Sequence, residues 1–387
     1  MSDLRSKSNK KFMLLSAIGI FMVVDHHTFT AVNLLGDYLP YNSFFMPMFV
    51  FISGYFNKVD SSTNLLKYIW KKIKGLLIPY IGLSIFAFLL EQLIYMIKLQ
   101  EVPEIPSWYL SYVLERIVTV GSFGSIAIPM WFVIALFATL IVYSVIKRIL
   151  SKIWNSYVML PVFTGLHILS IFMANNMNED YLPYFLVLLK VMFFLPFIEI
   201  GIIYREHLEK KHSAMPVGCK IGLLSGLLII NAIRTMCLPE PYDIAFDSID
   251  EMAGFTSPVI VTPLISSLIG ILFWLTVTDL IGKPLYDSKF INYMSCNTFW
   301  IMSLHIVFFN IFNLILLLIK ENVIFIRYFD SDYFRETEWY FWEISPNIKI
   351  VYVVIGILGP LGIKLIYDKF TGFISSRLRT LLSRSST

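Results

Sequence analysis

The chain has 387 residues, of which 57% are hydrophobic and 15% are charged, and its mean hydropathy is +0.70. An ordinary soluble domain has about 25% charged residues, so this composition excludes a soluble globular protein and predicts a polytopic membrane protein. The net charge of +4 is too small to indicate a nucleic-acid partner, and three scattered cysteines exclude a disulfide framework and a cysteine zinc site.

Ten apolar segments are close to the length needed to cross a bilayer, which is about 20 residues at 1.5 Å each. They occupy residues 12–32, 41–57, 73–97, 126–146, 154–174, 182–203, 217–238, 257–281, 290–318 and 349–366. The second segment is short, and the ninth is long enough to be tilted or broken. The sequence therefore predicts an all-α fold, a polytopic membrane helical bundle of about ten transmembrane helices.

Lysine and arginine predict the orientation of the bundle, because basic residues are retained preferentially on the cytoplasmic side. If the N-terminus is inside, 23 of the 31 basic residues fall in segments assigned to the cytoplasm, and the alternation holds through all ten spans. We therefore predict an N-in, C-in topology for a single membrane domain over residues 1–387, with basic cytoplasmic tails at 1–11 and 368–387. The first span is expected to be an uncleaved helix, because no small-residue cleavage site follows it.

The first span contains the sequence VVDHHTF, which places Asp25, His26 and His27 consecutively in an apolar segment. Each buried ionisable group costs about 2.5–3.5 kcal/mol at the centre of a membrane helix unless it is paired or wetted. Neighbouring residues on a helix point about 100° apart and cannot share one partner, so a water-filled cavity is a cheaper explanation than hydrogen bonds to neighbouring helices. A metal site is disfavoured, because adjacent histidines do not converge on one ion as histidines at i and i+4 do.

Histidine has an ordinary pKa of about 6.5, which suits proton transfer near neutral pH. We therefore interpret His27 as a general base for attack by a hydroxyl group, with Asp25 or another acceptor fixing the tautomer of its ring. Helical rise places His27 about 24 Å beyond Lys11, in the outer half of the membrane. His26 is a second catalytic candidate beside it.

Other spans contain polar or aromatic residues that permit two readings each. Ser53 is either a helix-packing hydroxyl or a donor in a site. Lys72 and Lys74, at the predicted cytoplasmic mouth, suit either the phosphates of a cytoplasmic donor or anionic lipid. Trp131 begins the fourth span from the outside and is either interfacial or part of a site.

The ninth span adds Asn297, which either joins helices together or contacts substrate, and His305, about 20 Å into the membrane by helical rise and so at a depth compatible with His27. Two outer loops, residues 239–252 and 327–344, combine acidic with aromatic side chains. These loops are either solvated and interfacial or form a carbohydrate-contacting surface.

Several stretches resemble, in order and spacing, the integral-membrane acyltransferase-3 family, which includes bacterial surface-glycan O-acetyltransferases. The stretches are SAIGIFMVVDHH (16–27), FFMPMFVFISGYF (44–56), KKIKGLLIPY (71–80), MWFVIALF (130–137), FFLPFIEIGIIYRE (193–206) and YMSCNTFWIMSLH (293–305). The resemblance covers the chain from about Lys11 to Ile366, and ten spans is also the family's number. Ser16 and Gly75 depart from the pattern, since many members have a basic residue and an arginine there.

The resemblance implies that acyl-CoA binds from the cytoplasm, that its acyl-pantetheine arm threads into the bundle, and that a histidine at the position of His27 promotes transfer to a hydroxyl on the outer side. It implies no bound cofactor, because acetyl-CoA or another short acyl-CoA is a donor substrate. The candidate catalytic residues are thus His27, Asp25 and His26. The candidate substrate-binding residues are Ser53, Lys72, Lys74, Tyr80, Trp131, Asn297 and His305.

We expect an O-acyltransferase, and O-acetyl transfer in particular, that acts on a cell-surface or exported polysaccharide in the bacterial plasma membrane. Its expected partners are acyl-CoA inside, a glycan outside and membrane lipid. The alternative is a non-enzymatic translocator or export subunit for a glycan or lipid-linked sugar. A regulatory subunit of a polysaccharide machine is a third reading. Binding or hydrolysis of acetyl-CoA distinguishes the first from the others. The sequence does not distinguish direct transfer, with His27 as general base, from a covalent acyl-histidine, and it does not give the acceptor, the acyl group or the oligomeric state.

Overall fold

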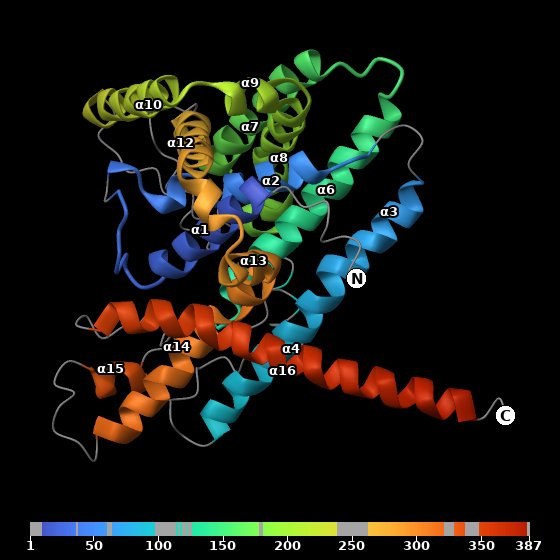
Figure 1. Cartoon of the computed structure of the whole chain (residues 1–387), viewed down its shortest axis with the longest axis vertical. Helices are drawn as coiled ribbons and strands as arrows, with labels where there is room; N and C mark the ends of the chain where they lie inside the picture. The colour runs from blue at the N-terminus through green and yellow to red at the C-terminus, as the bar shows by residue number, and fades with distance from the viewer. Residues whose placement is uncertain are drawn as a thin grey trace.

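The computed structural model describes residues 10–35, 38–59, 64–96, 114, 117, 121, 126–177, 181–237, 262–320, 329–336 and 348–384. Within these residues the regular structure is entirely helical, and Figure 1 shows the helices gathered into one bundle. The predicted all-α fold is confirmed. The acidic and aromatic loop 239–252, most of 327–344, and residues 1–9 of the N-terminal tail lie outside the described residues.

The first half of the chain supplies a series of helices that begins with the histidine-bearing one. In chain order they are α1 (Lys10–His26), the 3-10 turn η3 (Tyr41–Ser43), α2 (Phe45–Phe56), α3 (Leu65–Lys72), the π-helical turn η4 (Ile73–Leu77), α4 (Ile78–Met96), the 3-10 turn η5 (Ile128–Met130), α6 (Trp131–Ile149) and α7 (Ser156–Asn176).

The second half continues with longer helices. They are α8 (Leu182–Ile203), the π-helical turn η6 (Tyr204–Leu208), α9 (Glu209–Ala214), α10 (Val217–Cys237), α12 (Thr262–Leu285), α13 (Lys289–Cys296), α14 (Thr298–Lys320), α15 (Ser331–Glu336) and α16 (Lys349–Arg384).

Eight helical runs among the described residues are long and apolar enough to cross a membrane. They are Leu65–Met96, Ile128–Ile149, Ser156–Asn176, Tyr184–Ala214, Val217–Cys237, Thr262–Gly282, Thr298–Ile319 and Lys349–Phe373, and each overlaps a predicted span. The two remaining predicted spans contain α1 and α2, which are shorter, with 17 and 12 residues. The chain is therefore a multi-pass membrane protein, while the count of ten crossings and the N-in, C-in orientation stay predictions.

The first helix ends earlier than the sequence predicted. We expected a span through Val32, but α1 stops at His26 and the chain turns. The carboxylate of Asp25 accepts the backbone N–H groups of Val32 and Asn33 at 3.0 and 3.1 Å. Phe29 has a φ of 52°, which a right-handed helix does not contain. The side chain of Asp25 thus competes with helix continuation and holds a tight turn directly after the histidines.

The ninth predicted span, residues 290–318, consists of two helices. α13 ends at Cys296 and α14 begins at Thr298. Between them, the side chain of Asn297 donates to the carbonyl of Tyr293 at 2.7 Å, and its backbone N–H bonds to the carbonyl of Met294 at 3.1 Å. Asn297 therefore provides hydrogen bonds to two carbonyl groups at the end of α13, and this gives it a structural role at the break between the helices.

α8 packs against three helices, α2, α6 and α7. Its contact with α2 depends on two glycines. A Cβ atom at Gly54 would lie 2.3 Å from the carbonyl oxygen of Ile198, and one at Gly201 would lie 2.3 Å from that of Phe51. The two backbones therefore touch, as small residues permit in membrane helix pairs.

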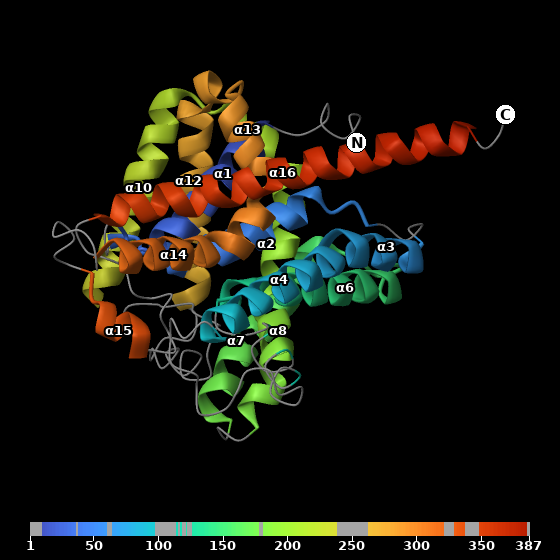
Figure 2. The same cartoon turned by 90° about the horizontal axis from the view of Figure 1, so that it is seen from below.

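α16 is the longest helix, with 36 residues. At 1.5 Å per residue it spans about 54 Å, which exceeds the roughly 30 Å hydrocarbon core of a bilayer. It packs against α14, and Figure 2 shows its C-terminal part extending past the other helices. The predicted basic tail from residue 368 is thus a continuation of α16 as far as Arg384.

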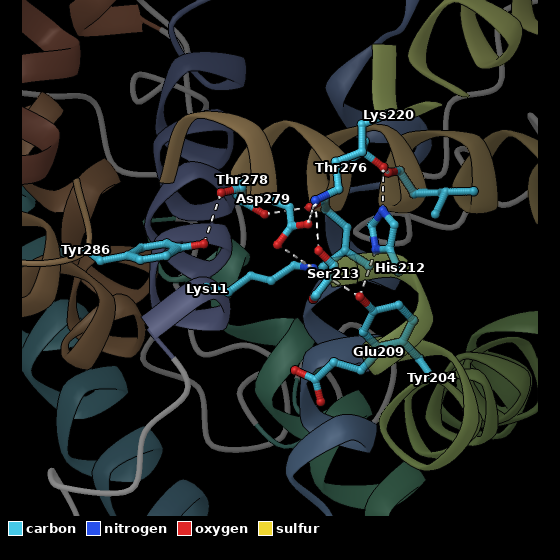
Figure 3. A network of polar contacts seen from close by, with 12 residues as sticks. Lys11, Tyr204, Glu209, His212, Ser213, Lys220, Thr276, Thr278, Asp279 and Tyr286 are labelled. Atoms are coloured by element: carbon cyan, nitrogen blue, oxygen red, sulfur yellow. Dashed lines mark hydrogen bonds and ion pairs between the residues drawn. The ribbon is translucent and has the colours of Figure 1, made fainter. Parts of the chain in front are cut away.

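A buried polar network ties the start of α1 to α9, α10 and α12 (Figure 3). Asp279 forms ion pairs with Lys11 at 3.2 Å and with Lys220 at 2.6 Å. Lys11 also donates to the hydroxyl of Tyr204 at 3.1 Å, and that hydroxyl lies 2.8 Å from Nδ1 of His212. The network therefore fixes the foot of the helix that leads to the histidines.

Replacing Asp279 with asparagine is expected to lower the free energy of unfolding by about 2 kcal/mol, because two buried ammonium groups lose their shared carboxylate while one acceptor oxygen remains. Thermal unfolding of the purified protein in detergent measures the change. Asp287→Asn is the matched control, since the pair between Asp287 and Lys10 is exposed and such pairs contribute at most about 1 kcal/mol. Equal stability of the two variants would contradict the role given to the network.

Candidate functional site

His27 and His305 meet in the interior of the bundle. Their ring centroids are 4.9 Å apart, and Nε2 of His305 lies 3.3 Å from Nδ1 of His27. His305 lies on α14 and is fully buried, whereas His27 lies in the turn after α1 and is half-buried. Folding thus joins two histidines that are 278 residues apart in the chain.

The backbone contacts of the two rings determine where their protons lie. Nδ1 of His27 is 2.8 Å from the carbonyl oxygen of Val23, and Nδ1 of His305 is 3.0 Å from that of Ile301. Because a carbonyl oxygen only accepts hydrogen bonds, each Nδ1 atom carries the hydrogen. Nε2 of His27 is then the lone-pair nitrogen of its ring, which is the form that a general base requires.

Asp25 does not orient the ring of His27. Its carboxylate oxygens accept the backbone N–H groups of Val32 and Asn33, and the hydroxyl of Thr28 lies 3.4 Å from Oδ1. The Nδ1–H group of His27 is directed at Val23 and His305 instead. The hypothesis that Asp25 fixes the tautomer is therefore replaced by a role in shaping the turn that carries His27.

His26 is half-buried and lies beside the pair. Its ring centroid is 5.5 Å from that of His27 and 5.6 Å from that of Phe45 on α2. The direct ring-to-ring hydrogen bond to α14 is made by His27. This geometry favours His27 over its neighbour as the reactive imidazole.

A cavity of about 190 Å³ lies between α1, α2, η4, α6 and α14. Its walls are Ser16, Ile20, Phe49, Ile52, Ser53, Leu76, Phe132, Val133, Leu136, Thr298, Phe299 and Met302. Three of these residues offer hydroxyl groups, the other nine are apolar, and none is ionisable. Such walls can admit an uncharged, extended chain, but they disfavour a charged group.

The cavity and the histidine pair lie along the same helix faces. On α1, Ser16 and Ile20 precede His27 by eleven and seven residues, and on α14 Met302 precedes His305 by three. These spacings return to one side of a helix with 3.6 residues per turn. By helical rise, the cavity walls on α1 and α14 lie about 5–17 Å from the level of the histidines, toward the start of α1.

The structure places Ser53 in the wall of this cavity. Two other predicted substrate-binding residues have structural partners. The buried hydroxyl of Tyr80 donates to the carbonyl of Gly121 at 2.7 Å, and the ring of Trp131 lies 4.5 Å from Nζ of Lys190. Neither residue lines the cavity.

Lys72 and Lys74 lie at the junction of α3 and η4. Their ammonium groups are 5.4 Å from the ring centroid of Tyr68 and 5.1 Å from that of Trp70. Leu76, two residues beyond Lys74, contributes to the cavity wall. The two lysines therefore precede the cavity along the same helical run without lining it.

The sequence prediction missed every cavity-lining residue except Ser53. On α1 and α14 a signal was present, because Ile20 and Met302 share a helix face with the two histidines. The contribution of α6, through Phe132, carried no such signal, since an apolar residue in an apolar span is not marked by its type.

Comparison with known proteins adds one finding. The family model described as an acyltransferase domain matches residues 11–367, a range that includes both histidines and every wall of the cavity. No curated protein and no solved structure matches the chain. By the extent of this match, the chain belongs to the acyltransferase-3 family of membrane acyltransferases.

Proposed function

We propose that the protein transfers an acyl group, acetyl in particular, from acyl-CoA on the cytoplasmic side to a hydroxyl of a cell-surface or exported polysaccharide, in a bacterial plasma membrane. The observation that carries this proposal is the position of His27. Its lone-pair nitrogen belongs to a half-buried ring beyond an uncharged cavity. A donor chain from one side and an alcohol from the other can meet there.

In the proposed reaction, Nε2 of His27 takes the proton of the acceptor hydroxyl as its oxygen attacks the carbonyl carbon of the thioester. The new C–O bond forms, and the tetrahedral intermediate collapses with cleavage of the C–S bond. The departing thiolate receives the proton from Nε2. The products are an ester and free CoA thiol, and the imidazole is restored, so no other reactant is consumed.

The cavity would hold the arm of the donor that carries the thioester. Its nine apolar walls suit the methylene groups of that arm, and the hydroxyls of Ser16, Ser53 and Thr298 can contact its amides. Lys72 and Lys74 would contact phosphates at the cytoplasmic end. Because the thioester is consumed inside the bundle, no soluble donor has to be exported.

Filling the cavity provides a test. Ser53→Phe is expected to lower the release of CoA thiol from acetyl-CoA by about 100-fold, because the added ring occupies the space of the donor arm. Ser53→Ala is the control and should stay within about 5-fold of the natural protein, since a neutral hydroxyl contributes about 1 kcal/mol at most sites. A thiol reagent measures the release with purified protein in nanodiscs. Full activity of a folded Ser53→Phe variant would contradict the donor route, and no release from the natural protein would favour a translocator.

A further inference from the structure

His305 is buried as deeply as any residue of the bundle, yet both of its ring nitrogens make polar contacts. Nδ1 lies 3.0 Å from the carbonyl of Ile301, and Nε2 lies 3.3 Å from Nδ1 of His27. Its exposed fraction is 0%. A substrate cannot reach either nitrogen without displacing one of these contacts, so the geometry does not support the predicted substrate-binding role of His305.

The proton positions make His305 an acceptor toward His27. Its Nδ1–H is committed to Ile301, so Nε2 presents a lone pair. The Nδ1–H of His27 is shared between that lone pair and the carbonyl of Val23 at 2.8 Å. The carbonyl of Val23 and Nε2 of His305 therefore both accept from the Nδ1–H group of His27. If the hydrogen were on Nε2 of His27 instead, its Nδ1 atom could not donate to either of them.

This arrangement matters most when His27 becomes charged. After His27 takes a proton it is an imidazolium, and hydrogen bonds from a charged donor are about twice as strong as neutral ones. The lone pair of His305 is already aimed at the nitrogen that shares this charge. In serine hydrolases a buried aspartate orients and stabilises a catalytic histidine in this way. A neutral imidazole can do so without placing a permanent charge in the membrane interior.

We infer that His305 is the positioning residue for His27, which selects the tautomer with a basic Nε2 and stabilises the imidazolium formed during acyl transfer. The inference rests on the proposed function and adds to it the partner that the sequence assigned to Asp25. Phe309 supports the ring of His305 from the same helix, with centroids 5.7 Å apart in an edge arrangement.

The test compares two replacements of His305 that differ in hydrogen bonding. His305→Leu removes the acceptor and is expected to lower kcat for CoA release from acetyl-CoA, with water as acceptor, by about 10- to 100-fold, the range for a hydrogen bond to a charged group. KM for acetyl-CoA should change little, because His305 does not touch the donor. His305→Gln offers an amide oxygen near the position of Nε2 and should recover a large part of kcat.

Two matched controls separate this role from general damage to the bundle. His167 is also fully buried, with Nδ1 2.8 Å from the carbonyl of Phe193, so His167→Leu removes an equivalent ring elsewhere. Ser303 is buried two residues from His305, and its hydroxyl has no hydrogen-bond partner within the described residues. Both His167→Leu and Ser303→Ala should retain the natural kcat.

A spectroscopic measurement keeps the inference testable even if His305→Leu does not fold. In the natural protein with ¹⁵N-labelled histidine, the signals of His27 should show a protonated Nδ1 and an unprotonated Nε2, and the opposite tautomer would overturn the inference. Unchanged kcat in folded His305→Leu, or a loss through KM alone, would also overturn it. If His27→Ala retains full activity as well, the proposed function itself fails, whereas an inactive His27→Ala beside a fully active His305→Leu refutes only the role of His305.

Discussion

Cells that carry His27→Ala in place of the natural protein are expected to lose acylation of their surface glycan, with the rate of transfer reduced by about 1,000-fold, since a positioned general base contributes 10²–10⁴-fold. The lone-pair nitrogen of His27 is the base in the proposed reaction, and its Nδ1–H group is already held by Val23 and His305. Alanine removes the base and leaves the lone pair of His305 without its partner. Mass spectrometry of the surface glycan, with and without the variant, measures the loss.

His26 provides the matched control for this prediction. It is the adjacent imidazole and is similarly half-buried, but the ring-to-ring hydrogen bond is made by His27. His26→Ala should retain transfer within about 10-fold, because it removes surrounding packing and not the base. Full glycan acylation in cells with His27→Ala, or an equal loss from the two variants, would refute the assignment of His27.

The second large effect concerns the packing that supports the site. Gly54→Ala is expected to destabilise the protein by at least about 3 kcal/mol, because overpacking commonly costs 1–3 kcal/mol and here the obstacle is backbone. The added methyl group would lie 2.3 Å from the carbonyl oxygen of Ile198, and no side-chain rotation relieves that contact. α2 and α8 would have to separate, which also moves Ser53 in the cavity wall. Thermal unfolding in detergent measures the change.

Gly82→Ala is the control for this substitution. Gly82 lies within α4, and a Cβ atom there would meet nothing within 4 Å. Alanine favours a helix by up to about 1 kcal/mol over glycine, so this variant should be as stable as the natural protein or slightly more so. If Gly54→Ala unfolds at the same temperature as Gly82→Ala, the close approach of α2 and α8 is not what holds this part of the bundle.

Much of the helical framework could be predicted from the sequence, because membrane helices are marked by length and hydropathy. The end of α1 could not. Residues 27–32 follow an apolar stretch and contain no proline or glycine that would mark a helix end. The turn is held by the carboxylate of Asp25, which accepts the backbone N–H groups seven and eight residues further on. Whether a side chain competes with a helix in this way depends on the folded backbone, which periodicity does not reveal.

The site was predictable in one part and not in another. His27 stood out because a titratable group in an apolar span needs compensation. The partner that provides this compensation did not follow from the sequence, since Asp25 is two residues from His27 and His305 is 278 residues away. Both can accept a hydrogen bond, and only the packing of α14 beside α1 decides between them. The cavity was equally hidden, because its walls come from five helical elements.

The central claim is that the protein cleaves a CoA thioester by means of the imidazole at position 27. The most direct measurement is the release of CoA thiol from acetyl-CoA by the purified natural protein, assayed beside His27→Ala in the same nanodiscs. We predict steady release by the natural protein and a rate near the uncatalysed background for the variant. Release that is absent from both, or equal in both, would contradict the account.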